Sequence, residues 1–218
     1  MARCTKEEAL ATRDRLLDAA ELVFSEKGVS RTSLNDIAEA AGASRGAIYW
    51  HFKNKADLFN AMMDRTTLPM EDSLQQIGHD AGRDPLAELQ GAILDAMRKI
   101  STDERTRRVF EVATLKVEYV DELLAVKERH LQCYVDNSAQ MQRSLEQAAA
   151  RRAEPLRLAA PVAAQGLHSL VVGLIHTWLL APTSFELVAV AEQAVATYLV
   201  GLGLLPMHVV GAPVVLAE

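Results

Sequence analysis

The chain has 218 residues, of which 50% are hydrophobic and 5% aromatic, and its formal net charge is −6. This acidic balance argues against indiscriminate nucleic-acid binding, and two cysteines far apart, Cys4 and Cys133, do not form a disulfide framework. We expect no signal peptide, because the N-terminus is charged and lacks an apolar run, and the most apolar stretch, Leu167 to Pro182, is expected to be too short and too polar to span a membrane. We therefore expect a cytoplasmic protein with no membrane partner.

The charge is distributed unevenly along the chain. Residues 1–65 contain ten basic and ten acidic side chains, so residues 66–218 carry the whole net charge of −6. A neutral N-terminal part still permits a local patch of basic side chains that could contact DNA.

The first expected helix begins with a capping box of Thr5 and Glu8 and ends near Glu26, before Gly28. Its buried stripe is predicted from apolar residues at helical spacing, which are Leu16, Leu17, Ala20, Val23 and Phe24. An amphipathic helix of this kind must pack its apolar stripe against other elements.

Two short helices joined by a tight turn are predicted between residues 32 and 52. Ser33 and Asp36 form a capping box at the start of one helix, and Ser44 can cap the other. Gly42 lies between them and accepts the left-handed conformation that a helix C-cap requires. This pattern is typical of a helix–turn–helix, whose second helix enters the DNA major groove, although a helical hairpin without DNA has the same outline.

The second of these two helices carries side chains suited to DNA. Arg45 and the backbone at Gly46 are expected at base edges, because they lie outward near the N-terminus of that helix. Trp50 and His51 are large, partly polar side chains where a core would favour Leu, and they are expected at phosphates. The full set of expected DNA-binding residues is Thr32, Ser33, Ser44, Arg45, Gly46, Ala47, Tyr49, Trp50, His51 and Lys55.

Six further helices follow and no strand is expected, so the sequence predicts an all-α fold of nine helices. The first of the six is expected to continue beyond Pro69 with a kink. Asp84 and Pro85 supply an N-cap and a first-turn proline, and Thr183 with Glu186 forms another capping box. The six helices are expected to start at Asn54, at Asp84, within 101–103, near Val120, near Val162 and at Thr183.

The residues around the predicted turn read GASRGAIYWHFKNKADLF, and the chain opens with MARCTKEEALATRDRLLDAAELVFSEKGVSRTSLNDIAEAAG. Both segments closely resemble the DNA-binding domain of the tetracycline-repressor (TetR) family, above all its AcrR-like branch, which controls multidrug efflux pumps. A looser similarity continues in RTRRVFEVATLKVEYVDEL and VVGLIHTWLLAP. The resemblance implies a helix–turn–helix domain at residues 1–54, a ligand-binding and dimerisation domain at residues 55–203 and a C-terminal tail at residues 204–218.

The last two expected helices are apolar on nearly all sides. Such helices must bury more than one face, either inside a monomer or against a second copy of the chain. The resemblance favours a homodimer held by a four-helix bundle, which would also place two recognition helices on a palindromic operator. The residues expected at this dimer contact are Leu170, Leu174, Trp178, Val190, Ala194 and Tyr198.

Polar side chains also interrupt the apolar faces of the fifth to eighth expected helices. A few polar groups in an apolar cavity are typical of a small-molecule pocket, whereas each of these residues taken singly could equally be a satisfied core or surface residue. Together with the resemblance, the pattern predicts a site for a hydrophobic inducer. The expected ligand-binding residues are Ile93, Met97, Phe110, Thr114, Tyr134, Asn137, Met141, His168, Val171 and Ile175.

Catalytic features are missing from the sequence. It contains no nucleophile with its base, no metal constellation and no phosphate-cradling glycine loop, so we expect neither an enzyme nor a cofactor. The resemblance implies a ligand-responsive transcriptional repressor of a multidrug efflux operon, which a hydrophobic molecule releases from its palindromic operator. The alternatives are a TetR-type regulator of a metabolic or lipid-related operon and a helical small-molecule-binding protein without a role in efflux.

Overall fold

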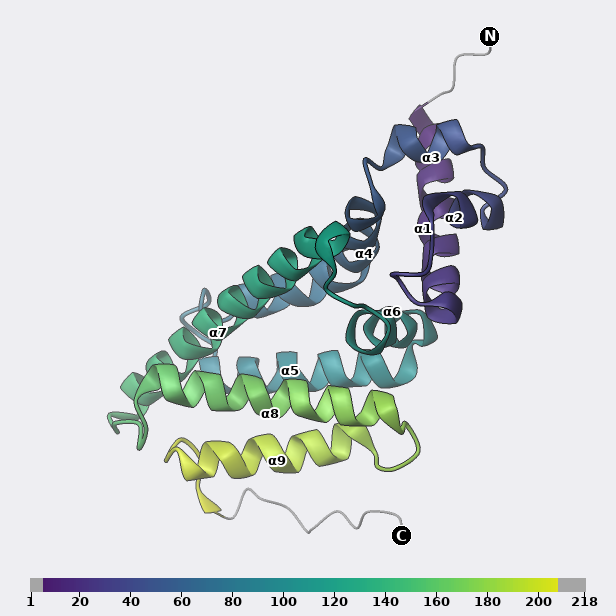
Figure 1. The fold of residues 1–218 in the computed structure, drawn as a ribbon. Coiled ribbons are helices and arrows are strands. Elements are labelled where there is room, and N and C mark those ends of the chain that lie inside the picture. The colour runs from purple at the N-terminus through teal and green to yellow at the C-terminus, as the bar shows by residue number, and fades with distance from the viewer. Residues whose placement is uncertain (1–5, 208–218) are drawn as a thin grey trace. The chain divides into compact units, whose positions relative to one another are not determined.

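The computed structural model describes residues 6–207, and within this range it contains nine α-helices, one short 3-10 turn and no strand (Figure 1). The predicted all-α fold is therefore confirmed. The elements are α1 (Lys6–Lys27), α2 (Leu34–Ala40), α3 (Arg45–His51), α4 (Lys55–Gln75), α5 (Pro85–Thr102), α6 (Glu104–Leu115), the 3-10 turn (Asp121–Leu123), α7 (Leu124–Arg152), α8 (Ala160–Leu180) and α9 (Leu187–Gly201).

The chain divides into two compact units. The first consists of Met1–Thr67 and Arg108–Leu131, and the second of Leu68–Arg107 and Gln132–Glu218. The boundaries fall inside α4, α6 and α7, so each of these three helices contributes residues to both units.

The core of the first unit joins α1, α2, α3 and the first half of α4. Its largest side chains include Phe24 and Phe59, whose ring centroids are 6.0 Å apart. The core also receives Val109 and Val112 from α6, Leu123 from the 3-10 turn and Val126 from the first turn of α7. The helix–turn–helix of this chain is therefore supported by a segment that follows it by more than fifty residues in the sequence.

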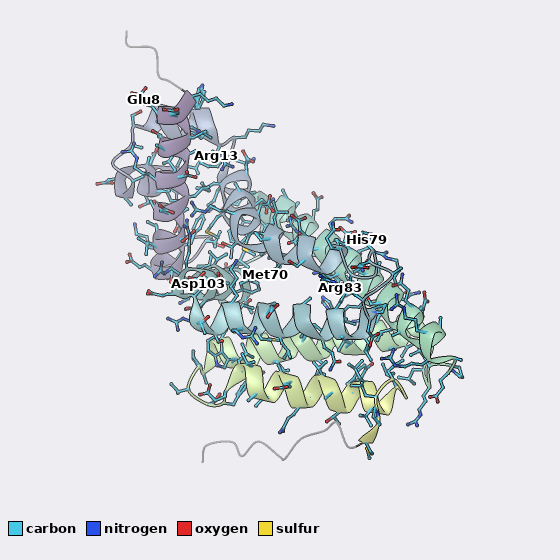
Figure 2. All side chains as sticks on the ribbon, turned by 180° about the vertical axis from the view of Figure 1, so that it is seen from behind. Glu8, Arg13, Met70, His79, Arg83 and Asp103 are labelled. Carbon is cyan, nitrogen blue, oxygen red and sulfur yellow. The ribbon has the colours of Figure 1, made fainter. Side chains whose placement is uncertain are left out.

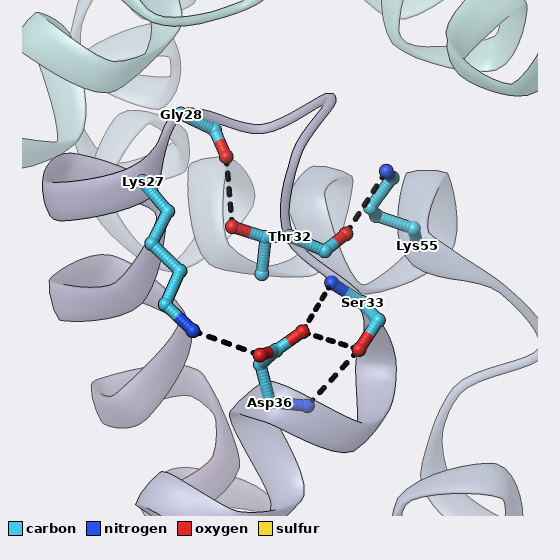
Figure 3. Close-up of polar contacts among 6 residues, drawn as sticks. All are labelled: Lys27, Gly28, Thr32, Ser33, Asp36 and Lys55. Carbon is cyan, nitrogen blue, oxygen red and sulfur yellow. Dashed lines mark hydrogen bonds and ion pairs between the residues drawn. The ribbon is translucent and has the colours of Figure 1, made fainter.

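The predicted caps of α2 and α3 are confirmed. The Ser33 hydroxyl accepts a hydrogen bond from the Asp36 amide at 3.2 Å, and the Asp36 carboxylate accepts from the Ser33 amide at 2.9 Å (Figure 3). Gly42 has a φ of +60°, as a left-handed residue after a helix should. The Ser44 hydroxyl accepts from the Ala47 amide at 3.1 Å, which fixes where α3 starts.

Two further caps in the later helices are also confirmed. The Asn54 side chain accepts a hydrogen bond from the Asp57 amide at 2.8 Å, and α4 continues through Pro69 to Gln75. The Asp84 side chain caps α5 by accepting from the Leu86 amide at 3.2 Å, with Pro85 in the first turn. These caps are local in sequence, which explains why residue spacing could reveal them.

The second unit places α9 against both α5 and α8, and these three helices lie side by side (Figure 1). The loop between α4 and α5, where His79 and Arg83 are labelled in Figure 2, is held by α7. Arg151 donates to the carbonyl oxygen of Ala81 at 3.1 Å and also to that of Arg83, and Gln140 donates to the carbonyl of Ile77 at 3.0 Å. The loop is thus fixed by side chains whose position the local sequence does not reveal.

The predicted start of the ninth helix is wrong. Thr183 does not cap α9, because residues 181–184 form a turn in which the Ala181 carbonyl accepts from the Ser184 amide at 3.0 Å and the Ser184 hydroxyl at 2.7 Å. The helix begins only at Leu187, and Glu186 is its N-cap without a side-chain hydrogen bond. Thr5, the capping residue of the expected box with Glu8, and residues 208–218 of the expected tail lie outside the described residues.

Helix α8 starts earlier than expected, with Pro161 in its first turn, where a missing N–H costs nothing. Its 21 residues include an 18-residue apolar window with a mean hydropathy of 1.3, which is long and apolar enough to cross a membrane, unlike the shorter stretch considered from the sequence. Only 28% of that apolar window is buried within the chain. Core helices of soluble proteins pass the same test, so the apolar character indicates first of all a helix that needs partners on several sides.

Candidate nucleic-acid interface and ligand-binding region

Helix α3 separates its buried and exposed sides sharply. Ile48 is fully buried in the core of the first unit, whereas Trp50 is 72% exposed and Arg45 and Tyr49 are exposed beside it. A large aromatic side chain beside an exposed Arg and Tyr provides both an apolar surface and hydrogen-bond donors to a partner. The exposed face of α3 is therefore the candidate nucleic-acid interface.

The Arg45 side chain lies over the ring of Tyr49, one helical turn later, at 5.6 Å from the ring centroid. This cation–π contact restrains the guanidinium before any DNA is present. Since Arg is the side chain best suited to two hydrogen bonds with guanine, a restrained Arg45 at the start of the helix is well placed to read a base.

Gly46 lies beside Arg45 on the same exposed face. A Cβ atom added at Gly46 would meet only the Ser44 hydroxyl, at 3.8 Å, so the fold itself does not require a glycine there. The open space above this backbone is what a close approach to a base edge or a phosphate needs. This observation supports the role expected for Gly46.

His51 follows Trp50 and stands edge-on to its ring, with the ring centroids 4.5 Å apart. Burial lowers the pKa of His51, and the positive charge of Arg13 lowers that pKa further. The imidazole is therefore neutral at pH 7, so that a phosphate contact from His51 would be a hydrogen bond from a neutral donor.

The two serines expected at DNA differ in what their hydroxyls can still do. Ser33 already donates its hydroxyl hydrogen to the Asp36 carboxylate, while its oxygen accepts from the Asp36 amide. Among residues 6–207, the Ser44 oxygen accepts from the Ala47 amide and its exposed O–H has no acceptor, so this O–H can donate to a phosphate. Lys27 and Ser33 hold the pKa of Asp36 below its ordinary value, with the Lys27 hydrogen bond as the larger cause.

Thr32 and Lys55 are placed differently from the exposed DNA contacts that the sequence suggested. Both are buried, and Lys55 is only 9% exposed. The Thr32 hydroxyl donates to the Gly28 carbonyl at 2.7 Å, and the Lys55 ammonium donates to the Thr32 carbonyl at 3.0 Å (Figure 3). The Lys55 ammonium also donates to the Ser30 carbonyl at 3.0 Å. The loop before α2 has carbonyl oxygens that no helix satisfies, and these two side chains satisfy them.

The residues expected to bind a ligand fall in both compact units. Phe110 and Thr114 belong to the first unit and the other eight to the second. Within the second unit, Tyr134 of α7 and His168 of α8 are brought together edge to face, with ring centroids 5.1 Å apart, and the Tyr134 hydroxyl bonds to Gln165. The apolar residues are either buried in the unit, as Ile93, Met97 and Met141 are, or half-buried on α8, as Val171 and Ile175 are.

A pocket of about 300 Å³ opens between the second-unit parts of α4 and α7. Of the expected ligand-binding residues only Asn137 lines it, and the Asn137 amide donates to the Cys133 sulfur at 3.3 Å. The other lining residues are Leu68, Glu71, Asp72, Gln75, Cys133, Asp136, Ala139 and Arg143. This polar and charged lining differs from the apolar pocket that the sequence suggested.

The residues expected at a dimer contact do not form the open face of α8. Trp178 is only 5% exposed, and Tyr198 of α9 packs against Gly166 and donates its hydroxyl to the Ala163 carbonyl at 2.9 Å, all within one chain. The other four expected residues, Leu170, Leu174, Val190 and Ala194, are half-buried. The exposed apolar side chains of α8 lie on a different side of the helix, and they are Val162, Val172 and Leu180.

Comparisons with known proteins identify an N-terminal and a C-terminal region of one family of regulators. The family model described as "Bacterial regulatory proteins, tetR family" matches residues 16–62, and the one described as "MAATS-type transcriptional repressor, C-terminal region" matches residues 84–203. The HTH-type transcriptional regulator TtgR of Pseudomonas putida is 37% identical over 206 residues, which cover 94% of this chain and 98% of TtgR.

Two solved structures are similar in both fold and sequence. The first is NalD, the secondary repressor of the MexAB-OprM multidrug efflux pump in Pseudomonas aeruginosa, with a TM-score of 0.82 and 35% identity over 89% of this chain and 98% of NalD. The second is a complex of triclosan with SmeT, the repressor of the Stenotrophomonas maltophilia multidrug efflux pump SmeDEF. That complex has a TM-score of 0.79 and 32% identity over 94% of this chain and 99% of SmeT.

The chain therefore belongs to the TetR family of bacterial transcriptional regulators. It is a DNA-binding repressor of the helix–turn–helix type, as its sequence had suggested.

Proposed function

We propose that this protein represses a multidrug efflux operon by binding a palindromic operator as a homodimer in the cytoplasm, and that a hydrophobic small molecule releases it. The observation that carries the DNA-binding part is the exposed face of α3, with Arg45 restrained by Tyr49 and open space over Gly46. We assign DNA binding to residues 1–54 and ligand binding and dimerisation to residues 55–203.

The DNA contacts are proposed residue by residue. Arg45 and the backbone of Gly46 meet bases, Ala47 and Tyr49 lie near thymine methyl groups or phosphates, and Trp50 contacts a phosphate. The phosphate contacts from Ser33, Ser44 and His51 complete the set, with Ser44 supported by its available hydroxyl hydrogen.

Dimerisation is supported by α8. Its side chains Val162, Val172 and Leu180 are apolar, exposed and on one face, and covering them with a second copy would remove that apolar surface from water. A pair of identical chains also offers two α3 helices, which a palindrome requires.

The role in efflux and the hydrophobic inducer are supported by the relatives. NalD and SmeT are named as repressors of multidrug efflux pumps, and SmeT was solved with triclosan. Within the second unit, the contact between Tyr134 and His168 supplies polar groups that could orient such a molecule beside the apolar residues of α8.

The test is a fluorescence-anisotropy titration of the full chain on DNA from upstream of its own gene, against an unrelated sequence of equal length. We expect operator binding with a stoichiometry of two chains per palindrome. Triclosan and other hydrophobic antimicrobials are then added to the complex, and at least one should release the DNA and raise the melting temperature of the free protein. Binding to the operator that no compound reverses would contradict the drug-sensing part alone, whereas equal binding to both DNAs would contradict operator recognition.

A further inference from the structure

The loop between α1 and α2, residues 28–33, is held from inside the first unit by a single ammonium group. Lys55, the first residue of α4, donates to the Ser30 carbonyl and to the Thr32 carbonyl at 3.0 Å each. Its nitrogen also lies 2.6 Å from a carboxylate oxygen of Glu122, which belongs to the 3-10 turn before α7. An ammonium group has three hydrogens to donate, and three acceptors surround this one.

These three contacts determine whether the Lys55 ammonium is available to a DNA phosphate. A lysine that held a DNA phosphate would have to withdraw a hydrogen bond from one of its three acceptors. It would also leave a carbonyl of the loop without a partner, and an unpaired buried polar group is costly. Since Lys55 is only 9% exposed, its charge is directed at the loop rather than at the surface of α3.

A second link joins the same loop to the same neighbouring segment. The Val29 amide donates to the Lys116 carbonyl at 3.0 Å, just after the end of α6. Residues 116–122 connect α6 to α7, and both of these helices contribute residues to the second unit as well as to the first. The loop is therefore attached at two points to the junction between two helices that the two units share.

The loop in turn ends at Ser33, the N-cap of α2. The cap fixes where α2 begins, and α2 packs against α3. A shift of residues 30–32 would move the start of α2 and hence the helix that faces DNA.

We propose that Lys55 and Glu122 are positioning residues for operator binding. Lys55 sets operator affinity by holding residues 30–32 rather than by contacting a phosphate, and Glu122 ties this hold to the junction of α6 and α7. The proposal rests on the proposed DNA-binding function, and it gives Lys55 a role opposite to the one its position beside the exposed Lys53 would suggest.

A positioning role and a phosphate-contact role for Lys55 predict opposite results for Glu122→Gln, which removes the ion pair and keeps the size of the side chain. If Lys55 and Glu122 together position the loop, the substitution weakens operator binding by about threefold to tenfold, as loss of a partly buried charged contact would. The salt dependence of operator binding then stays unchanged. If Lys55 instead contacts a phosphate, removal of its competing carboxylate tightens operator binding and steepens the salt dependence.

The matched control is Asp121→Asn, which removes one negative charge from the neighbouring exposed residue of the same turn. The operator affinity of Glu122→Gln is compared with this control, so that the general effect of lost negative charge near DNA cancels. Lys53 is exposed just after α3 and is therefore suited to a phosphate contact. Lys53→Ala serves as the reference for the loss of such a contact, with a salt slope expected to be lower by about one unit.

Lys55→Met is the second variant, and its folding is checked by circular dichroism and by its melting temperature. In the double variant with Glu122→Gln we expect little further loss of operator affinity, because the two side chains act as one unit. Operator affinity equal to that of Asp121→Asn with a lowered melting temperature would show a purely structural pair and overturn the proposal. Tighter binding by Glu122→Gln would overturn it too.

The wild-type titration distinguishes a failure of the proposed DNA-binding function from a failure of the positioning role of Lys55 and Glu122. A wild-type protein that binds no operator overturns the proposed function together with this inference. A wild-type protein that binds, followed by either contrary result above, overturns only the positioning role of Lys55 and Glu122.

Discussion

Single residues on α3 show how the surface for DNA is prepared before DNA arrives. Tyr49 restrains Arg45 through a contact of 5.6 Å, and Gly46 leaves the backbone beside it uncovered. A restrained guanidinium loses less conformational freedom on binding, and this favours specific contacts over loose attraction to phosphates. In an acidic protein, specificity has to come from such geometry, because net charge does not attract DNA.

Arg45→Ala should therefore lower operator affinity by about 1–3 kcal/mol and relax sequence preference, because the proposed role of Arg45 is a bidentate contact to a base. The measurement is anisotropy on the operator, on single-base variants and on unrelated DNA. Equal losses on operator and unrelated DNA would show that Arg45 contacts only phosphates. Tyr49→Phe keeps the ring under Arg45 and should leave the preference for the operator unchanged.

Asp36 gives a prediction about pH. Its folded-state pKa is depressed by Lys27 and Ser33, so the carboxylate contributes stability above its ordinary value of 3.8 and loses that contribution as pH falls through the lower folded value. Asp36→Asn should thus lower the melting temperature at pH 7, and the difference from wild type should shrink at pH 3. A difference of the same size at both pH values would mean that the capping geometry matters and the charge does not.

At the scale of helices, the sequence allowed the elements and most of their starts to be predicted, because their signals are local. Ser33 with Asp36, Asn54, and Asp84 with Pro85 each act within four residues of themselves. Thr183 carries the same type of signal, but there a competing turn of residues 181–184 delays the helix. A capping motif therefore predicts that a helix is near, while the alternative hydrogen bonds decide where it starts.

Contacts between residues that lie far apart in the sequence could not be predicted. Lys55 was expected at DNA because it follows the recognition helix, yet its partners Ser30 and Glu122 are 25 and 67 positions away in the sequence. The sides of α8 are also difficult to distinguish from the sequence, because an almost fully apolar helix has no polar face as a reference. Trp178, which is expected at the dimer contact, is buried within the chain, whereas Val172 is exposed.

The open face of α8 predicts where dimerisation is sensitive. Val172→Glu should give monomers and abolish operator binding, because a charge buried in an apolar contact is costly and each monomer offers a single α3. Sedimentation equilibrium at micromolar concentration measures the association. Leu131→Glu on α7 is the control, since Leu131 is 52% exposed and Val172 is 47% exposed. A Val172→Glu variant that remains dimeric would exclude this face as the contact.

The whole molecule must connect ligand and DNA through elements that belong to both units, and these are α4, α6 and α7. Any inducer acts only through its different affinities for the DNA-bound and free forms. A shared helix can transmit such a difference if its two ends prefer different positions in the two forms. Pro69 lies two residues beyond the boundary in α4, where the missing N–H weakens the helix and makes bending easier.

Reciprocity gives the last prediction its quantitative form. An inducer that lowers operator affinity about 100-fold must bind the free form better by about 2.7 kcal/mol, and operator DNA must weaken inducer binding by the same factor. Calorimetric titration of the inducer into free and operator-bound protein measures one factor, and operator titration with and without saturating inducer measures the other. Two unequal factors would mean that the compound acts on the DNA or at a second site.

Tyr134→Ala should weaken inducer binding and leave the operator affinity of the unliganded protein unchanged, because Tyr134 contacts Gln165 and His168 of α8 and lies far in sequence from α3. Val135→Ala, at the exposed neighbouring position, should change neither. A Tyr134→Ala protein that loses operator binding without inducer would show that Tyr134 supports the fold of the repressor and does not belong to its ligand site.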